Sequence, residues 1–344
     1  MIGLGALDEL PALVRRLGTS TALVVTDSRV RRLWGMDVVQ RLERAGFQVP
    51  LLALPAGERS KTLAMLARVL SFAEQQGLDR GACLVALGGG TVGDLAGFAA
   101  GVWLRGIAYF QVPTTLLAMV DSSIGGKTAV NTAKTKNAVG VFWQPEAVVS
   151  DLAVLRTLPP VEYRTAFGEV VKYAVAMDAE LASLLESDRE RLNARDPEAL
   201  EAVVTLCVKA KAAVVAADER DQGERAILNY GHTAGHALEV ASGYRVAHGQ
   251  AVAFGMRVAA RIAARSGLSE PGLVATQDRL LAGFGLPGRL PAVAAEAILE
   301  AIPRDKKARA GQVAWVLPRE LGRAEPGHQA DARLVSKAVR EALP

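Results

Sequence analysis

Three histidines within seventeen residues are the most concentrated chemical feature of this sequence. The chain has only four histidines in 344 residues, and His232, His236 and His248 all lie in the segment 228–249. Histidine is the usual metal ligand and proton carrier near neutral pH. His232 and His236 are four residues apart, so they share one face if the segment is helical. The cluster therefore predicts a metal or acid–base site rather than separate core histidines.

The residues close to these histidines in the sequence limit the kinds of site that the segment could form. Arg225 and Asn229 continue the same spacing backwards, so a helix reaching back to Arg225 would carry four polar side chains within about 60° of arc. The metalloprotease motif HExxH requires a glutamate after the first histidine. Thr233 stands there instead, which excludes that class of protease.

The composition indicates an ordinary globular chain of one large or two medium domains. It is 50% hydrophobic and 22% charged. The net charge of +4 is too small to indicate nucleic-acid binding, and no basic run has interleaved aromatic residues. The longest uncharged stretch, residues 106–120, is too short and too polar to span a membrane.

The cysteines and the N-terminus favour a cytoplasmic protein. Cys83 and Cys207 lie in apolar runs without a CxxC motif, which is typical of buried thiols in a reducing compartment. Asp8 and Glu9 occupy the place where a signal peptide would be basic. We therefore expect no contact with a membrane or with nucleic acid.

The first half of the chain alternates apolar β-branched runs with helical patterns, as in a mostly parallel sheet. A helical pattern at 62–76 ends at Gly77, a common helix terminator. The expected strands cover residues 21–27, 49–54, 82–87, 107–112 and 148–152. This pattern predicts an α/β nucleotide-binding domain.

A glycine-rich turn follows the third strand. Gly88, Gly90 and Gly93 match GxGxxG before a helical run at 95–102, and such glycines let the backbone approach a pyrophosphate at a helix N-terminus. No acidic residue stands about 20 residues further on, where the dinucleotide fold would place its ribose contact. Asp27, at the end of the first strand, could bind a ribose or cap the following helix, and both interpretations stay open.

A second glycine segment precedes a lysine. Gly125, Gly126 and Lys127 resemble a phosphate loop, but Asp121 stands where the Walker motif has its first glycine. The sequence therefore argues against ATP hydrolysis.

Asp196 and Pro197 form a helix cap followed by a first-turn proline, which predicts a long helix from there to about residue 217.

Beyond Pro159 and Pro160 the pattern is mostly helical, with one short extended piece at 313–317. Glu169 and Lys172 lie three residues apart on a largely apolar helix and need partners there. They form either an internal ion pair or a metal ligand beside a substrate lysine. We expect an α/β domain over 1–158 and an all-α metal- and substrate-binding domain over 159–344, with the site in the cleft between them.

Eight segments, in order between residues 24 and 307, resemble the 3-dehydroquinate synthases of the sugar-phosphate cyclase group. They are highly specific for the group and less decisive among its members, and the N-terminus is shorter than usual. The resemblance implies an NAD-binding domain, a helical metal-binding domain and a homodimer. The segments are GGGTVGDLAGF, LRG, PTTLLAMVDSSIGGKTAVN, KNAVGVF, GEVVK, LNYGHTAGHALE, HG and DKK.

The resemblance also implies a role for individual residues. Zn²⁺ or Co²⁺ would be held by Glu169, His232 and His248, with positions left open for substrate, and His236 would face the departing phosphate. The substrate pocket would contain Lys127, Asn137, Lys172, Lys211, Arg225, Asn229 and Lys306 (or Lys307), with Arg105 completing the phosphate site. NAD would contact Asp27, Glu58, Lys61, Gly89, Gly90, Asp94, Thr114, Thr115, Asp121, Lys127, Lys136, Thr157, Leu158 and Glu162.

The implied reaction converts 3-deoxy-D-arabino-heptulosonate 7-phosphate to 3-dehydroquinate and phosphate. It would proceed by transient oxidation with NAD, β-elimination of phosphate, re-reduction and an intramolecular aldol closure. The alternatives are a sister cyclase acting on a sugar phosphate without a carboxylate, a metal-dependent NAD alcohol or glycerol dehydrogenase, and a non-catalytic binding protein. Six of the ten lysines stand on the implied site positions. Among the site residues, Lys211 and Arg225 favour the substrate that carries a carboxylate as well as a phosphate.

Overall fold

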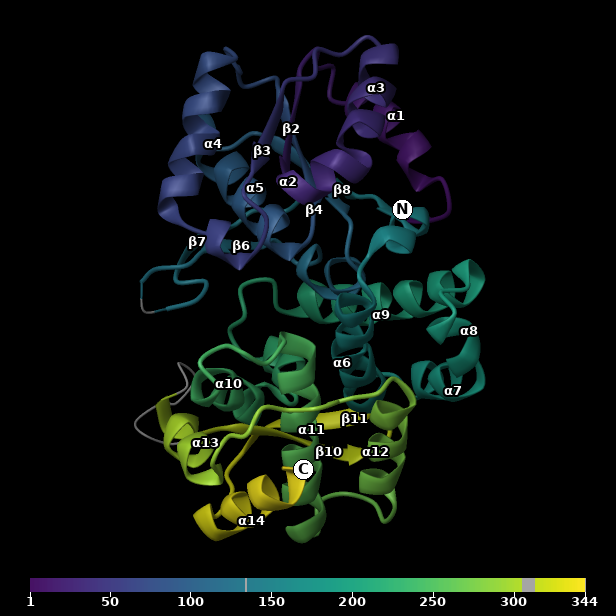
Figure 1. Ribbon diagram of the computed structural model, residues 1–344, viewed down its shortest axis with the longest axis vertical. Helices are drawn as coiled ribbons and strands as arrows, with labels where there is room; N and C mark the ends of the chain where they lie inside the picture. The colour runs from purple at the N-terminus through teal and green to yellow at the C-terminus, as the bar shows by residue number, and fades with distance from the viewer. Residues whose placement is uncertain (134, 305–312, 344) are drawn as a thin grey trace. The chain divides into compact units, whose positions relative to one another are not determined.

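The computed structural model describes residues 1–133, 135–304 and 313–343 (Figure 1). The chain forms two compact units, Met1–Pro159 and Pro160–Pro344. The functional division expected from the sequence, with the nucleotide in residues 1–158 and the metal and substrate in 159–344, stays a prediction.

A five-stranded parallel sheet forms the centre of the first unit. Its three central strands are buried almost along their whole length, which explains why their sequences are continuous apolar runs rather than alternating ones. In spatial order the strands are β3 (Leu51–Leu54), β2 (Ala22–Asp27), β4 (Cys83–Gly88), β5 (Ala108–Pro113) and β8 (Ala147–Val148). The expected α/β class is thus confirmed. The last expected strand is split, because β9 (Ser150–Asp151) pairs with β1 (Ile2–Gly3) instead.

Helices cover both faces of this sheet (Figure 1). One face carries α4 (Leu63–Gln75) and α5 (Gly90–Val102), and the other carries α1 (Leu10–Arg15) and α3 (Met36–Arg44). The first core includes Leu23, Val25, Leu84, Val69 and Leu95, each at most 1% exposed. This buried core holds the sheet in place. It therefore also determines where the residues that follow the carboxyl ends of the strands lie.

Helix α5 begins at Gly90, five residues earlier than expected. Its glycines are therefore helical and serve close packing. A Cβ on Gly93 would lie 2.6 Å from Oε1 of Gln111, and one on Gly97 would lie 2.5 Å from Cγ2 of Thr128. The sequence placed Gly90 and Gly93 in a turn before the helix, since glycine is a poor helix former.

An antiparallel hairpin follows the second glycine segment. It consists of β6 (Lys127–Val130) and β7 (Val139–Phe142). A Cβ on Gly140 would lie only 2.0 Å from the carbonyl oxygen of Thr128, so this pairing requires glycine. Lys127 thus begins a strand and not the helix that follows a Walker loop.

The second unit is mostly helical, as expected, with one antiparallel hairpin added. The hairpin strands are β10 (Trp315–Glu320) and β11 (Arg323–His328). His328 is the last residue of β11. The helices are α6 (Pro160–Ala176), α7 (Ala179–Ser187), α8 (Arg189–Asn193), α9 (Pro197–Ala217), α10 (His232–Ala241), α11 (His248–Arg265), α12 (Leu273–Gly283), α13 (Ala295–Ala301) and α14 (Ala332–Ala342).

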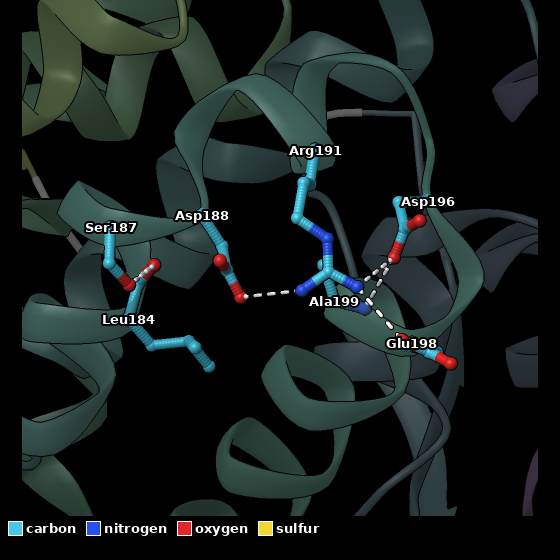
Figure 2. A network of polar contacts seen from close by, with 7 residues as sticks. All are labelled: Leu184, Ser187, Asp188, Arg191, Asp196, Glu198 and Ala199. Atoms are coloured by element: carbon cyan, nitrogen blue, oxygen red, sulfur yellow. Dashed lines mark hydrogen bonds and ion pairs between the residues drawn. The ribbon is translucent and has the colours of Figure 1, made fainter.

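One arginine fixes the start of the long helix α9. Figure 2 shows Arg191 reaching three carboxylates, Asp188 at 3.4 Å, Asp196 at 2.8 Å and Glu198 at 3.0 Å. Asp196 also caps α9 by accepting from the backbone N–H of Ala199, as the sequence predicted. A surface groove of about 800 Å³ between α7 and α9 contains none of the expected site residues.

None of the helices in the described ranges combines the length and the apolarity that crossing a membrane needs.

Candidate functional site

Three helices of the second unit bring the expected metal ligands together. Glu169 lies in the middle of α6, while His232 and His248 are the first residues of α10 and α11. One ligand atom from each residue lies within 4.8 Å of the other two. Residues 63 and 79 positions from Glu169 in the chain thus meet at one point.

The Glu169 carboxylate is at the centre of this group. Its Oε1 lies 3.3 Å from Nε2 of His232 and 3.1 Å from Nε2 of His248. A tetrahedral zinc site with bonds of about 2.0–2.2 Å separates its ligand atoms by about 3.4 Å. The spacing of the two oxygen–nitrogen pairs therefore fits a metal without rearrangement.

The His232 ring shows why a cation fits here. Its Nδ1 lies 3.2 Å from the carbonyl oxygen of Tyr230, which only accepts, so Nδ1 carries the proton. Burial lowers the pKa of His232 to about 4, despite the opposing charge of Glu169, so the ring is neutral at pH 7. Its Nε2 lone pair then faces a carboxylate oxygen, and a cation between them would satisfy both.

The other imidazole has an acidic partner on its outer side. Nδ1 of His248 lies 3.6 Å from Oε1 of Glu239, a residue that is 6% exposed. Burial alone would lower the pKa of His248, but Glu169 and Glu239 raise it to about 10. An outer carboxylate of this kind orients a metal-bound histidine.

A lysine completes the inner group. Nζ of Lys172 lies 2.5 Å from Oε2 of Glu169, and the two side chains are at most 2% exposed. Burial alone would raise the pKa of Glu169, but Lys172 and then His232 hold it well below its usual value. Of the two interpretations left open by the sequence, the ion pair is present, and it lies beside the candidate metal ligands.

The histidine segment is not one continuous helix. A 3₁₀ helix over Glu224–Asn229 ends before α10, and Gly231 between them has φ +79°. A Cβ on Gly231 would also lie 2.7 Å from Cγ of Met256. The condition for placing Arg225, Asn229, His232 and His236 on one helical face is therefore not met, because Gly231 breaks the helix and is required there both for its backbone and for its packing.

The remaining expected substrate residues of this unit lie on several elements. His236 is on α10, with its ring 5.3 Å from that of His232 and 6.4 Å from that of His248. Lys211 on α9 is 6% exposed, and Arg225 is 3% exposed. Asn229 ends the 3₁₀ helix. Lys306 and Lys307 lie outside the described residues.

In the first unit, the carboxyl ends of the parallel strands collect most expected nucleotide contacts at one edge of the sheet. β2 ends at Asp27, and Gly89 and Gly90 follow β4 at the N-terminus of α5. Thr114 and Thr115 follow β5, and the N–H of Thr114 donates to the carbonyl of Gly88 at 2.9 Å. The strand order changes direction between β2 and β4, where open α/β sheets bind their ligands.

A polar network lies beside this edge. Nζ of Lys61 donates to Oδ2 of Asp94 and to Oδ1 of Asn137. Oε1 and Oε2 of Glu58 accept from Nδ2 of Asn131 at 2.8 Å and from Oγ1 of Thr91 at 2.9 Å. Glu58, Lys61 and Asp94, which are expected nucleotide contacts, therefore lie in the same polar network as Asn137, which is an expected substrate contact.

The other expected residues of the first unit lie on several further elements. Asp27 caps α2 (Ser28–Val30) through the N–H groups of Arg29 and Val30, so its helix-capping interpretation is confirmed and its ribose contact stays a prediction. Thr157 accepts from Nε1 of Trp34 at 3.0 Å. The rest are Arg105, exposed at the end of a 3₁₀ turn, Asp121 in a π-helical turn, Lys127 at the start of β6, Lys136 in the β6–β7 turn and buried Leu158. Glu162 is exposed in the first turn of α6, in the second unit.

Sequence reasoning missed four residues that hold these groups in place. They are Thr91, Asn131, Glu239 and Tyr230, the last through its backbone carbonyl. Asn131 and Glu239 are the final residues of two recognised motifs, VDSSIGGKTAVN and LNYGHTAGHALE. Their position at the end of each motif was the available signal.

Comparisons with known proteins agree with this geometry. The family model of the 3-dehydroquinate synthase N-terminal domain matches residues 51–165, and that of the C-terminal domain matches 166–308. The 3-dehydroquinate synthase of Desulforamulus reducens is 47% identical over 309 residues, which cover 88% of this chain and 85% of the relative.

Solved structures of related cyclases have the same fold. A 2-deoxy-scyllo-inosose synthase complexed with carbaglucose-6-phosphate, NAD⁺ and Co²⁺ is 29% identical with a TM-score of 0.92, covering 99% of this chain and 96% of that one. The 2-epi-5-epi-valiolone synthase of Streptomyces hygroscopicus, with NAD⁺ and Zn²⁺ bound, is 27% identical with a TM-score of 0.90, covering 99% and 95%. Together with the two family models and the 47% identical relative, these similarities show that the chain belongs to the 3-dehydroquinate synthase family.

Proposed function

We propose that this protein converts 3-deoxy-D-arabino-heptulosonate 7-phosphate to 3-dehydroquinate and phosphate, as a phosphate-eliminating lyase that uses NAD and Zn²⁺ or Co²⁺. The observation that carries the proposal is the convergence of Glu169, His232 and His248 on one point. The higher identity to 3-dehydroquinate synthases than to the two solved sister cyclases supports this substrate.

The metal would be held by residues of the second unit, and NAD mainly by residues of the first. Glu169, His232 and His248 would hold the metal, and the glycine turn with Glu58 and Lys61 would hold NAD. When bound, the two would supply polarisation of the substrate hydroxyls and reversible hydride exchange at carbon. The other contacts implied by the family resemblance are part of the same proposal.

The cationic side chains would bind the two anionic ends of the substrate. Lys211 and Arg225 are buried, and a buried cation binds an anion more strongly than an exposed one because less water screens the pair. A substrate with both a carboxylate and a phosphate uses more cations than a neutral sugar or alcohol. This supports the lyase over the dehydrogenase.

His236 would move the proton that accompanies phosphate departure. Its ring stands one helical turn after His232 on α10 and within 6.4 Å of the His248 ring. An imidazole near the ligands but outside the converging group can exchange protons near neutral pH. We also propose a homodimer in the cytoplasm, and the two buried thiols support a reducing compartment.

One assay separates the candidate activities. The protein is incubated with trace NAD⁺, Zn²⁺ and the heptulosonate phosphate, and phosphate release and NADH absorbance are followed together. We expect phosphate release without accumulation of NADH, and loss of turnover in Glu169→Gln. Stoichiometric NADH would instead indicate a dehydrogenase. Phosphate release only from sedoheptulose 7-phosphate or glucose 6-phosphate would indicate a sister cyclase.

A further inference from the structure

Asn131 forms three hydrogen bonds with two other segments of the first unit. It lies just after β6, and its backbone N–H donates to the carbonyl of Lys61 at 2.8 Å. Its side-chain Nδ2 donates to Oε1 of Glu58 at 2.8 Å. Its Oδ1 accepts from the backbone N–H of Asn137 at 2.8 Å. The residue therefore ties the loop before α4 to the turn between β6 and β7.

The partners of Asn131 determine the orientation of its amide. The Glu58 carboxylate only accepts and the Asn137 N–H only donates, so the amide cannot be flipped without losing both bonds. Thr91 occupies the other Glu58 oxygen through its hydroxyl, at 2.9 Å. Glu58 is thus held from two sides, by the first turn of α5 and by the end of β6.

The turn on the other side of Asn131 is held in an uncommon conformation. Asn137 has φ +52°, a left-handed backbone that asparagine tolerates better than most residues but that still needs support. The support comes from the bond to Asn131 and from Lys61, whose Nζ donates to Oδ1 of Asn137 and also to Asp94. The position of Asn137 therefore depends on the same residues that hold the expected nucleotide contacts.

We propose that Asn131 is a positioning residue that couples the NAD contacts Glu58 and Lys61 to the substrate contact Asn137. The proposal rests on the function proposed above. Asn131 touches neither ligand itself, and it acts by fixing one carboxylate and one backbone turn with a single amide.

Three variants distinguish the hydrogen bond that the Asn131 amide donates to Glu58 from the one that it accepts from Asn137. Thr91→Val removes only the second bond to Glu58. Asn131→Asp keeps the acceptor for the Asn137 N–H but places an oxygen against the Glu58 carboxylate. Asn131→Ala removes both side-chain bonds. Asn193→Ala is the matched control, since its amide donates to the carbonyl of Gly283 in the other unit.

Two readouts are needed for each variant. The dissociation constant of NAD⁺ is measured by titration calorimetry without substrate, and KM and kcat for the heptulosonate phosphate are measured at saturating NAD⁺. We expect NAD⁺ to bind about 10-fold more weakly to Asn131→Asp and Asn131→Ala, and several-fold more weakly to Thr91→Val. Only Asn131→Ala should also raise KM at saturating NAD⁺, by about 10-fold, because it alone releases the Asn137 turn.

The two readouts test separate parts of the proposal, namely the positioning of Glu58 and its coupling to Asn137. An unchanged NAD⁺ affinity in Asn131→Asp, which preserves the side-chain shape, would overturn the positioning of Glu58. A wild-type KM in Asn131→Ala at saturating NAD⁺ would overturn the coupling. If the wild-type protein does not release phosphate from this substrate, the proposed function fails and the coupling fails with it. The NAD⁺ titrations would still decide whether Asn131 positions Glu58.

Discussion

The surroundings of His232 and His236 in the structure distinguish two histidines whose spacing in the sequence does not. Both lie on α10 one turn apart, and the sequence alone gives them equal standing as ligands. In the structure the His232 ring has the Tyr230 carbonyl on one nitrogen and Glu169 on the other. His236 is not in the group of converging ligand atoms found among the described residues.

We therefore predict that His236→Ala retains the metal and loses turnover. General acid–base catalysis contributes about 10²–10⁴-fold to a rate, so kcat should fall within that range. Metal content per chain, measured by elemental analysis, should equal that of the wild type. His232→Ala is the matched comparison and should lose the metal, and the opposite pattern would exchange the roles of the two histidines.

Glu239 gives a second prediction at the scale of the residue. Its carboxylate lies 3.6 Å from Nδ1 of His248, where it would orient the ring and strengthen it as a ligand. We expect Glu239→Gln to weaken Zn²⁺ affinity by about 10–100-fold, the usual effect of losing such a partner. Competition with a chromogenic chelator measures this affinity without any turnover. Glu201→Gln, at an exposed position on α9, should bind Zn²⁺ like the wild type, and equal affinities in both variants would contradict the role of Glu239.

At the scale of the elements, the sequence predicted those strands and helix ends that depend on residues close together in the chain. The strands were found because buried parallel strands are continuous apolar runs. The start of α9 was found because Asp196 and Pro197 form a cap and a first-turn proline. The early start of α5, the β6–β7 hairpin and the break at Gly231 were missed. In α5 and at Gly231 the glycines are required by contacts with segments distant in the sequence, which no local window contains. In the hairpin, Gly140 is required by its contact with the opposite strand.

The packing of α6 on α11 gives a prediction at this scale. A Cβ on Gly249 would lie 1.7 Å from the carbonyl oxygen of Thr165, and one on Gly168 would lie 2.2 Å from that of Gly249. The backbones of the two helices therefore touch, next to Glu169 and His248. We expect Gly249→Ala to lower the free energy of unfolding by about 1–3 kcal/mol or more, because an overpacked core must shift.

The same substitution should also weaken Zn²⁺ binding, because it pushes His248 away from Glu169. Urea unfolding and chelator competition measure the two effects. Gly81→Ala is the control, since its Cβ would meet only a side-chain oxygen of Asp79 at 3.4 Å. Normal Zn²⁺ affinity in a destabilised Gly249→Ala would show that this helix contact does not position the ligands.

At the scale of the whole molecule, the candidate metal ligands and most of the candidate NAD contacts belong to different units. The three converging metal ligands lie in Pro160–Pro344, and the glycine turn with its polar network lies in Met1–Pro159. The sequence indicated this division through its change from alternating to helical pattern. It could not show that Glu169 meets His248, because a separation of 79 positions along the chain fixes no distance in space.

This division predicts separate effects of the two cofactors on hydrogen exchange. A ligand at 100 times its dissociation constant stabilises the folded state by about 2.7 kcal/mol, which slows exchange through the affected openings about 100-fold. Zn²⁺ alone should slow exchange in α6, α10 and the first turn of α11. NAD⁺ alone should slow it in residues 58–61, 88–94 and 131–137. Glu169→Gln should abolish the protection by Zn²⁺ and keep the protection by NAD⁺. If Zn²⁺ instead protected the glycine turn and left α10 unprotected, the metal would bind in the first unit, and the proposed ligands would be wrong.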